Sequence, residues 1–371
     1  MGLLALAIAP GIAICLFMGF GTLTKKTMIF FKLKTMSNCF SRLFFGLIFL
    51  IASISLRAQT VKLLNSGSKA SLRGLSVVSD DVVWVSGSGG SVGRSIDGGK
   101  NWTWKTVTGF EKTDFRDIEA FDKNTAIIMG IASPAYILKT TDGGQNWKLV
   151  YENKDTSMFL DAMEFWNEQS GIVIGDPIAD NIFIARTFDG GESWRNIPAA
   201  NIPTADKGEA FFASSGTNVR KLSKSEAVFV SGGLRARLFI RDKKIDLPII
   251  QGKESTGANS IAVKNKKTMI IVGGDFSAKD DTTKNCAITM DGGETFIAPV
   301  VGPHGYRSCV EYLGKKNWIC CGLIGVDYSS DEGLNWNWIS KDSFHVVRKA
   351  KKGKAIYFSS GGGRIGKLVW E

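Results

Sequence analysis

Histidine is scarce in this chain, which has only His304 and His345 among its 371 residues. Cysteine is almost as sparse beyond residue 58, where it occurs at four positions with no C-x-x-C spacing. A structural zinc site needs such ligands at close spacing, so the sequence argues against zinc, and we expect no bound metal. Walker-type and G-x-S-x-G motifs are also missing, which argues against P-loop and α/β-hydrolase chemistry.

One segment, GGGRIG at Gly361–Gly366, matches the dinucleotide-binding pattern G-x-G-x-x-G. That motif works only where a strand precedes it and a helix follows it, because the helix N-terminus holds the pyrophosphate. Only five residues follow Gly366, which is too few for that helix. We therefore expect no cofactor.

Strong positive charge is confined to the part of the chain before residue 59. The whole chain carries +11, but its first 58 residues hold six basic residues and no acid, which leaves +5 for residues 59–371. This mild charge argues against a nucleic-acid partner. A membrane-associated or acidic protein partner stays open.

Four cysteines remain beyond residue 58: Cys286, Cys309, Cys320 and Cys321. If SCVEYLGKKNWICC forms a tight hairpin that turns at Gly314-Lys315, Cys309 lies opposite Cys320. An exported protein can oxidise such a pair. The alternative is a strand with buried free thiols.

The most regular feature of the chain is a turn that occurs five times: a hydroxyl residue, any residue, Asp, a small residue or Glu, Gly, two further residues and an aromatic. The copies are SIDGGKNW (95–102), TTDGGQNW (140–147), TFDGGESW (187–194), TMDGGETF (289–296) and SSDEGLNW (329–336). Their aspartates are 45, 47, 102 and 40 residues apart, so one copy has decayed near Arg241-Asp242. Four short strands per unit at this period predict propeller blades.

Each copy falls at the last turn of its unit, where its residues have structural roles. Asp can accept backbone N–H bonds within the turn, Gly takes positive φ, and the aromatic packs the turn against its own sheet. A motif used five times cannot be five active sites, so we expect scaffold roles for ten residues. They are Asp97, Trp102, Asp142, Trp147, Asp189, Trp194, Asp291, Phe296, Asp331 and Trp336.

The predicted fold is an all-β, seven-bladed propeller that forms a single monomeric domain over residues 59–371. Six units start at Leu72, Phe115, Phe159, Glu209, Asn259 and Tyr306. The last unit, from Phe344 onward, supplies only three strands. We expect residues 60–64 (TVKLL) to add the fourth strand and so close the ring.

The first 58 residues do not belong to the repeat. Residues 36–58 resemble a signal peptide, with Arg42, an apolar run at Leu43–Ser55 and a cleavage point at Ala58. Residues 1–35 form an upstream extension, and the apolar run Leu3–Leu23 there is either untranslated or a membrane segment. This organisation predicts an exported protein.

The first strand of each blade lines the channel of a propeller, so charged residues at the strand starts are candidate contacts at the channel mouth. We expect these residues to bind a ligand or partner with acidic or zwitterionic groups. The alternative is a self-neutralising ring of ion pairs that seals the channel. The expected binding residues are Arg73, Arg116, Asp117, Asp161, Glu209 and Arg307.

The repeated turn is similar to the Asp-box, or BNR, repeat of sialidases, sortilin-type receptors and photosystem II assembly factors. The five turns, their spacing and the phrases LRGL, FRDIEAF and GYRSCVEY make residues 59–371 resemble the exported bacterial relatives of the photosystem II stability and assembly factor. That resemblance implies a non-enzymatic assembly scaffold that contacts a protein partner at the channel mouth.

Sialidases offer an alternative, glycoside hydrolysis at the same mouth. They hold a carboxylate with three arginines and use a Tyr/Glu nucleophile, which here implies Arg73, Arg116 and Arg307 with Tyr306. Other hydrolases with this repeat cut β-glucans between two carboxylates, a role open to Asp117 with Asp161 or Glu209. The Phe-Arg-Ile-Pro motif of sialidases is missing, and the residues favour a binding protein over an enzyme.

Overall fold

The computed structural model describes residues 59–371, so the expected extension and signal peptide lie outside the described residues. Within this range the chain forms 29 strands and two short 3₁₀ helices, η1 (Ala199–Asn201) and η2 (Gly361–Gly363). No helix in the described range is long and apolar enough to cross a membrane. The protein is therefore all-β, as predicted.

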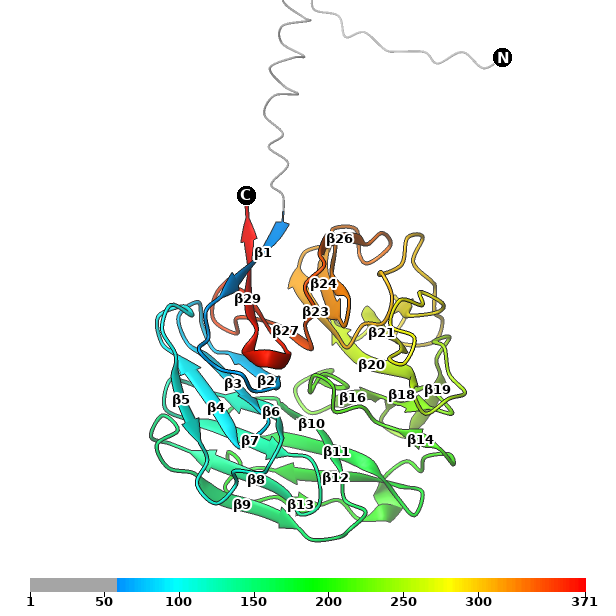
Figure 1. Cartoon of the computed structure of the whole chain (residues 1–371). Coiled ribbons are helices and arrows are strands. Elements are labelled where there is room, and N and C mark those ends of the chain that lie inside the picture. The colour runs from blue at the N-terminus through cyan, green and yellow to red at the C-terminus, as the bar shows by residue number, and fades with distance from the viewer. Residues whose placement is uncertain (1–58) are drawn as a thin grey trace, which may run out of the picture. The chain divides into compact units, whose positions relative to one another are not determined.

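Seven antiparallel sheets stand around a central axis as the blades of a propeller (Figure 1). Blade 1 contains β2 (Leu72–Val77), β3 (Val83–Gly87), β4 (Ser91–Ser95) and β5 (Thr103–Thr106). Blade 2 contains β6 (Phe115–Ala120), β7 (Ala126–Gly130), β8 (Ala135–Thr140) and β9 (Lys148–Asn153). Blade 3 contains β10 (Leu160–Phe165), β11 (Gly171–Ile178), β12 (Asn181–Thr187) and β13 (Arg195–Asn196).

The second half of the ring continues the same order. Blade 4 contains β15 (Val219–Lys221), β16 (Ala227–Val230), β18 (Arg237–Ile240) and β19 (Lys243–Asp246). Blade 5 contains β20 (Thr256–Val263), β21 (Met269–Asp275) and β22 (Cys286–Thr289), extended by β14 (Glu209–Ala210) and β17 (Gly232–Gly233). Blade 6 contains β23 (Cys309–Gly314), β24 (Asn317–Gly322), β25 (Gly325–Ser329) and β26 (Asn337–Ser340).

Blade 7 confirms the predicted ring closure. It contains β27 (Val346–Lys349), β28 (Ile356–Ser359), β29 (Ile365–Trp370) and, as its outer strand, β1 (Gln59–Leu64). β1 pairs antiparallel with β29 from Gln59 opposite Trp370 to Leu64 opposite Ile365. The two ends of the described chain thus share one sheet, and the free edge of β29 is covered.

Blade 4 departs from the expected strand order. Its inner strand is β15 at Val219–Lys221, whereas Glu209 lies in the two-residue strand β14, which pairs with Gly232–Gly233. These glycines allow the close approach, because a Cβ on Gly232 would lie 3.0 Å from the Cα of Gly257. Residues 211–218 connect β14 to β15 and belong to no strand.

The five repeat turns (95–102, 140–147, 187–194, 289–296 and 329–336) share one hydrogen-bond pattern. In the first turn, Gly99 N donates to Ser95 Oγ at 2.9 Å, and Asn101 N donates to Asp97 Oδ1 at 2.9 Å. These bonds lower the pKa of Asp97 to about 2, so its carboxylate stays ionised and occupied within the turn. Gly98 N also donates to Asp81 O at 2.9 Å, which ties the turn to the inner hairpin of the same blade.

The aromatic residue of each turn packs between two blades rather than against its own sheet alone. Trp147 of blade 2 meets Trp84 of blade 1 edge to face, with ring centroids 6.5 Å apart. Trp336 of blade 6 belongs to a cluster with Ile270 of blade 5. Trp194 and Trp336 are buried, and Trp102, Trp147 and Phe296 are half-buried. The predicted wedge therefore joins neighbouring blades.

The predicted cysteine pairing is wrong by one residue. Cys309 lies opposite Cys321, and Cys320 lies opposite Val310. The hairpin turns at Lys315-Lys316 instead of Gly314-Lys315, and the register shifts between Tyr312 and Gly314. Together these two changes place Cys309 opposite Cys321, one residue from the predicted partner. All four cysteines of residues 59–371 are buried and free.

Candidate functional site

A cavity of about 480 Å³ opens at the end of the ring where the inner strands start, and we call it the upper cavity. Four inner strands begin with a β-bulge, and the unpaired residues there are Arg73, Arg116, Asp161 and Asn259. A bulge turns its residue away from the regular alternation of the strand. Arg73, Arg116 and Asn259 consequently line the upper cavity.

The cationic side of the upper cavity comes from blades 1, 2 and 7. Arg73 Nη1 donates to Ser214 O at 3.3 Å, and Arg116 Nε pairs with Asp114 at 2.8 Å. His345 lies beside them, and its burial together with Arg73, Arg116 and Arg364 lowers its pKa to about 3. The imidazole is therefore neutral at physiological pH, and the arginines supply the positive charge that can hold an anionic group.

The other side of the upper cavity is apolar. Phe276 is 43% exposed, and its ring stands edge to face against Phe212 at 5.9 Å and Tyr306 at 6.3 Å. Phe159 and Phe211 extend the same wall. The cavity thus offers exposed aromatic surface next to guanidinium groups, a composition typical of protein-binding sites.

Tyr306 and two carboxyl groups, Asp161 and Asp176, flank this cavity. The Tyr306 hydroxyl donates to Asn259 Oδ1 at 2.7 Å, and burial raises its pKa above the ordinary value. Burial raises the pKa of Asp161 well above its usual range and that of Asp176 to about 6. Asp161 is fully buried, and Asp176 accepts a bond from Phe211 N at 2.8 Å. Sequence reasoning missed Asp176, which follows the apolar run of β11.

Two of the predicted contact residues lie in buried ion pairs away from the cavity lining. Arg307 is fully buried, and its Nε donates to Asp327 Oδ2 at 2.7 Å. Glu209 is also buried and accepts a bond from Arg237 Nε at 3.0 Å. The three-arginine clamp expected from the sialidase resemblance therefore has two members, Arg73 and Arg116, at the cavity.

Residues 212–218 cross the channel below the upper cavity, and we call them the plug segment. Ser215 Oγ donates to Ser308 O of blade 6 at 2.7 Å, and Thr217 Oγ1 contacts Ser260 Oγ of blade 5 at 2.6 Å. Gly216, with φ of 62°, packs on the Asp117 carboxylate of blade 2, because a Cβ there would lie 2.4 Å from its oxygen. The plug segment separates the two ends of the channel.

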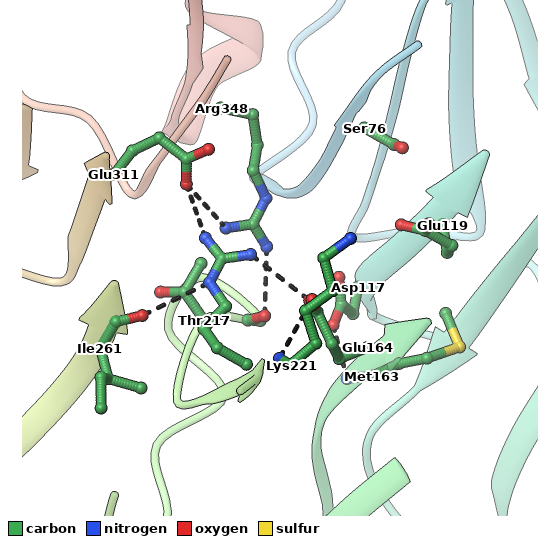
Figure 2. A network of polar contacts seen from close by, with 12 residues as sticks. Ser76, Asp117, Glu119, Met163, Glu164, Thr217, Lys221, Ile261, Glu311 and Arg348 are labelled. Carbon is green, nitrogen blue, oxygen red and sulfur yellow. Dashed lines mark hydrogen bonds and ion pairs between the residues drawn. The ribbon is translucent and has the colours of Figure 1, made fainter. Parts of the chain in front are cut away.

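A second cavity, of about 380 Å³, opens where the inner strands end, and we call it the lower cavity. Its lining holds a network of paired charges, part of which is drawn in Figure 2. Arg220 Nη2 donates to Glu311 Oε2 at 2.6 Å, and Arg348 Nη2 donates to Gly216 O of the plug segment at 3.1 Å. Lys351 Nζ lies 2.6 Å from Glu119 Oε1. The self-neutralising ring expected as the alternative consisted of the residues at the strand starts, whereas these pairs join other residues at the lower end.

Asp117 belongs to this lower end. Its Oδ2 accepts a bond from Met163 N at 2.8 Å and its Oδ1 one from Ile118 N at 2.8 Å. Burial raises its pKa to about 7, although Arg348 and these N–H groups act in the opposite direction. Asp117 lines the lower cavity, while Asp161 and Glu209 are buried elsewhere, so the chain does not assemble the expected carboxylate pair in one cavity. Within residues 59–371, no three His, Cys, Asp or Glu side chains converge as metal ligands would.

Comparison with known proteins finds likeness at the level of the fold. A structure described as YCF48 bound to D1 peptide has a TM-score of 0.61 and 14% identity, over 86% of this chain and 97% of that chain. YCF48 from Cyanidioschyzon merolae has a TM-score of 0.61 and 16% identity, over 83% and 98%. The WD40 β-propeller domain of Doa1 has a TM-score of 0.58 and 15% identity, over 84% and 97%. No family model and no curated protein matches the sequence.

Proposed function

We propose that this protein is an exported, non-enzymatic scaffold that binds a protein partner in the upper cavity. The observation that carries the proposal is the meeting of Arg73 and Arg116 with the Phe276 wall in one cavity. Such a surface suits a segment that presents a carboxylate beside an apolar side chain. The likeness to YCF48, one of whose structures holds a D1 peptide, supports protein binding by a propeller of this shape.

Several features of the upper cavity fit binding better than glycoside cleavage. A retaining or inverting glycosidase needs two carboxyl groups facing the substrate at a set separation. Here Asp176 lines the cavity, Asp161 is fully buried, and Tyr306 is engaged with Asn259. No arrangement in the described chain favours hydrolysis, so we carry forward the binding function alone. Export forms part of the proposal because residues 36–58 resemble a signal peptide.

The test compares partner capture by the wild-type protein with capture by the double variant Arg73→Ala and Arg116→Ala. Each purified protein is immobilised and incubated with a detergent extract of the source cells, and the captured proteins are measured by quantitative mass spectrometry. Arg195→Ala serves as the matched control, because Arg195 is exposed on β13 of blade 3. We expect a specific set of proteins to be retained by wild type and control and lost from the double variant.

Folding of each variant is checked by its thermal unfolding midpoint. Arg73 and Arg116 are only half-buried, so their removal should leave that midpoint nearly unchanged. Identical capture by wild type and the folded double variant would contradict the proposed site. If the wild type hydrolysed a glycoside of a test panel and the double variant did not, the upper cavity would be a catalytic site and the proposed binding function would be wrong.

A further inference from the structure

A pair of lysines occupies the tip of the inner hairpin on three consecutive blades. The β20–β21 hairpin of blade 5 carries Lys266-Lys267, the β23–β24 hairpin of blade 6 carries Lys315-Lys316, and the β27–β28 hairpin of blade 7 carries Lys351-Lys352. All six are exposed. We call them the lysine arc, since inner strands β20, β23 and β27 are neighbours around the channel. They are spread over 87 residues, so a search for charge runs misses them.

Most of the arc is free of carboxylate partners. Lys266 Nζ pairs with Glu226 at 2.9 Å, and Lys351 Nζ pairs with Glu119 at 2.6 Å. Within residues 59–371, the structure shows no ion pair for the four others. These are Lys267, Lys315, Lys316 and Lys352. Each of the three blades thus keeps at least one ammonium group available to a partner.

The hairpin tips are held in place by backbone hydrogen bonds. Gly292 N donates to Lys267 O at 2.9 Å, Glu332 N donates to Lys316 O at 3.0 Å, and Lys352 N donates to Val78 O at 3.0 Å. The first two bonds come from the repeat turns, which explains why the tips of blades 5 and 6 keep fixed positions. A partner therefore meets ordered backbone at these tips, which lowers the entropy cost of binding.

The arc lies at the lower end of the channel and borders the lower cavity. Lys351 and Lys352 line that cavity, together with Lys221 and Lys349. The lining also holds Glu119, Glu164, Glu168 and Glu311, so a narrow anionic chain follows the tips of blades 5 to 7 outside the cavity and does not enter it. The plug segment separates this region from the upper cavity, so the two surfaces can act independently.

Acidic hairpins on blades 1 to 3 limit what the arc can bind, and the first of them adjoins the arc, because Asp80 accepts a bond from Lys354 N of blade 7 at 2.6 Å. The inner hairpins of blades 1 to 3 carry Asp80, Asp81, Asp122 and Glu168, all exposed. A flat anionic membrane or a long duplex that touched all seven hairpins would meet these carboxylates as well as the lysines. The arc tips also lack arginine and aromatic side chains, which nucleic-acid surfaces use for base contact and stacking. These facts favour a narrow acidic partner.

We propose that the lysine arc, Lys266, Lys267, Lys315, Lys316, Lys351 and Lys352, binds an acidic protein segment, a run of Asp and Glu residues in extended conformation. This is a second partner surface, distinct from the upper cavity. Binding depends on many weak, exposed charge pairs, so it is fast to form and falls steeply with added salt.

The test uses a fluorescein-labelled decaglutamate peptide and the purified protein, with anisotropy measured at about 20 mM and 150 mM salt. The arc variant changes Lys267, Lys315, Lys316 and Lys352 to Glu. The control makes the same change at four exposed lysines outside the arc, Lys62, Lys105, Lys112 and Lys207, so its net charge is identical. We expect the arc variant to bind about tenfold more weakly or worse, while the control stays within a few-fold of wild type.

The double variant Arg73→Ala and Arg116→Ala should leave decaglutamate binding unchanged. Failure of the lysine arc can therefore be distinguished from failure of the upper-cavity function proposed above. Equal losses in the arc variant and its charge-matched control would overturn the proposal, as would undetectable binding by the wild type. Binding to phosphatidylserine vesicles or duplex DNA but not to the peptide would also overturn it. A salt-sensitive dimer in sedimentation, lost in the arc variant and without peptide binding, would assign the arc to a second copy of the chain instead.

Discussion

Trp336 provides the sharpest test of how the repeat turns hold the blades together. Its side chain is 1% exposed and packs in the cluster formed with Ile270, Val272 and Trp318. Trp336→Ala removes the indole and leaves a cavity between blades 5 and 6, which should lower the free energy of unfolding by about 3–5 kcal/mol. The matched control is Trp338→Ala in the same blade, because Trp338 is 41% exposed and should cost much less.

The indole N–H adds a second prediction at the same position. Trp336 Nε1 is buried without a hydrogen-bond partner, and leaving an N–H unpaired costs about 1–3 kcal/mol. Trp336→Phe removes that donor while keeping most of the ring, so we expect a loss below about 1.5 kcal/mol. The chain already contains this substitution, since Phe296 takes the aromatic place in the blade 5 turn and joins the cluster of blades 4 and 5.

Urea denaturation followed by circular dichroism measures all three variants under one set of conditions. The expected order of stability is wild type, then Trp336→Phe, then Trp336→Ala, with Trp338→Ala near wild type. If Trp336→Ala cost no more than Trp338→Ala, the claim that the aromatic joins two blades would be refuted. Equal losses for Phe and Ala at position 336 would contradict the expectation that a phenyl ring keeps most of the packing between the two blades.

Two further predictions concern pH and ring closure. Burial raises the pKa of Asp176 from 3.8 to about 6, so between these values the folded protein keeps a proton that the unfolded chain has released. Stability should therefore fall as pH rises from about 4 to 6, and Asp176→Asn should flatten that fall in denaturation curves; an unchanged slope would contradict the burial argument. Deletion of Gln59–Leu64 uncovers the edge of β29, so the thermal midpoint should drop and unfolding should become dependent on protein concentration. A deletion variant with the wild-type midpoint would show that β1 does not contribute to closure.

The repeat turns could be predicted from the sequence because their determinants are local. Ser95, Asp97 and Gly99 bond within five residues, so the pattern specifies the turn wherever it occurs. The count of strands per unit then predicted the missing outer strand of blade 7. Sequence reasoning failed where a residue depends on distant partners. Arg307 pairs with Asp327 on another strand, and nothing in GYRSCVEY shows that the guanidinium points into the blade.

The start of an inner strand is a poor place to infer side-chain direction for a physical reason. Residues alternate between the two faces of a strand, and a β-bulge at the start shifts that alternation by one. The bulges at Arg73 and Arg116 bring these residues to the upper cavity, whereas Asp117, the next residue, lines the lower one. One residue of register thus separates a guanidinium group at the upper cavity from a buried carboxyl group.

Blade 4 shows what replaces a decayed turn. In each of the five blades that keep the repeat turn, a backbone N–H of the turn donates to a carbonyl of the inner hairpin, as Gly98 N does to Asp81 O. In blade 4 the corresponding outer turn has Arg241 at φ of 56°, and its guanidinium pairs with Glu226 of the inner hairpin. A backbone bond has thus been exchanged for an exposed ion pair, which contributes less and weakens with salt. The blade that lost its repeat turn is also the one whose inner strand β15 directly follows residues 212–218, which cross the channel and form the partition between the two cavities.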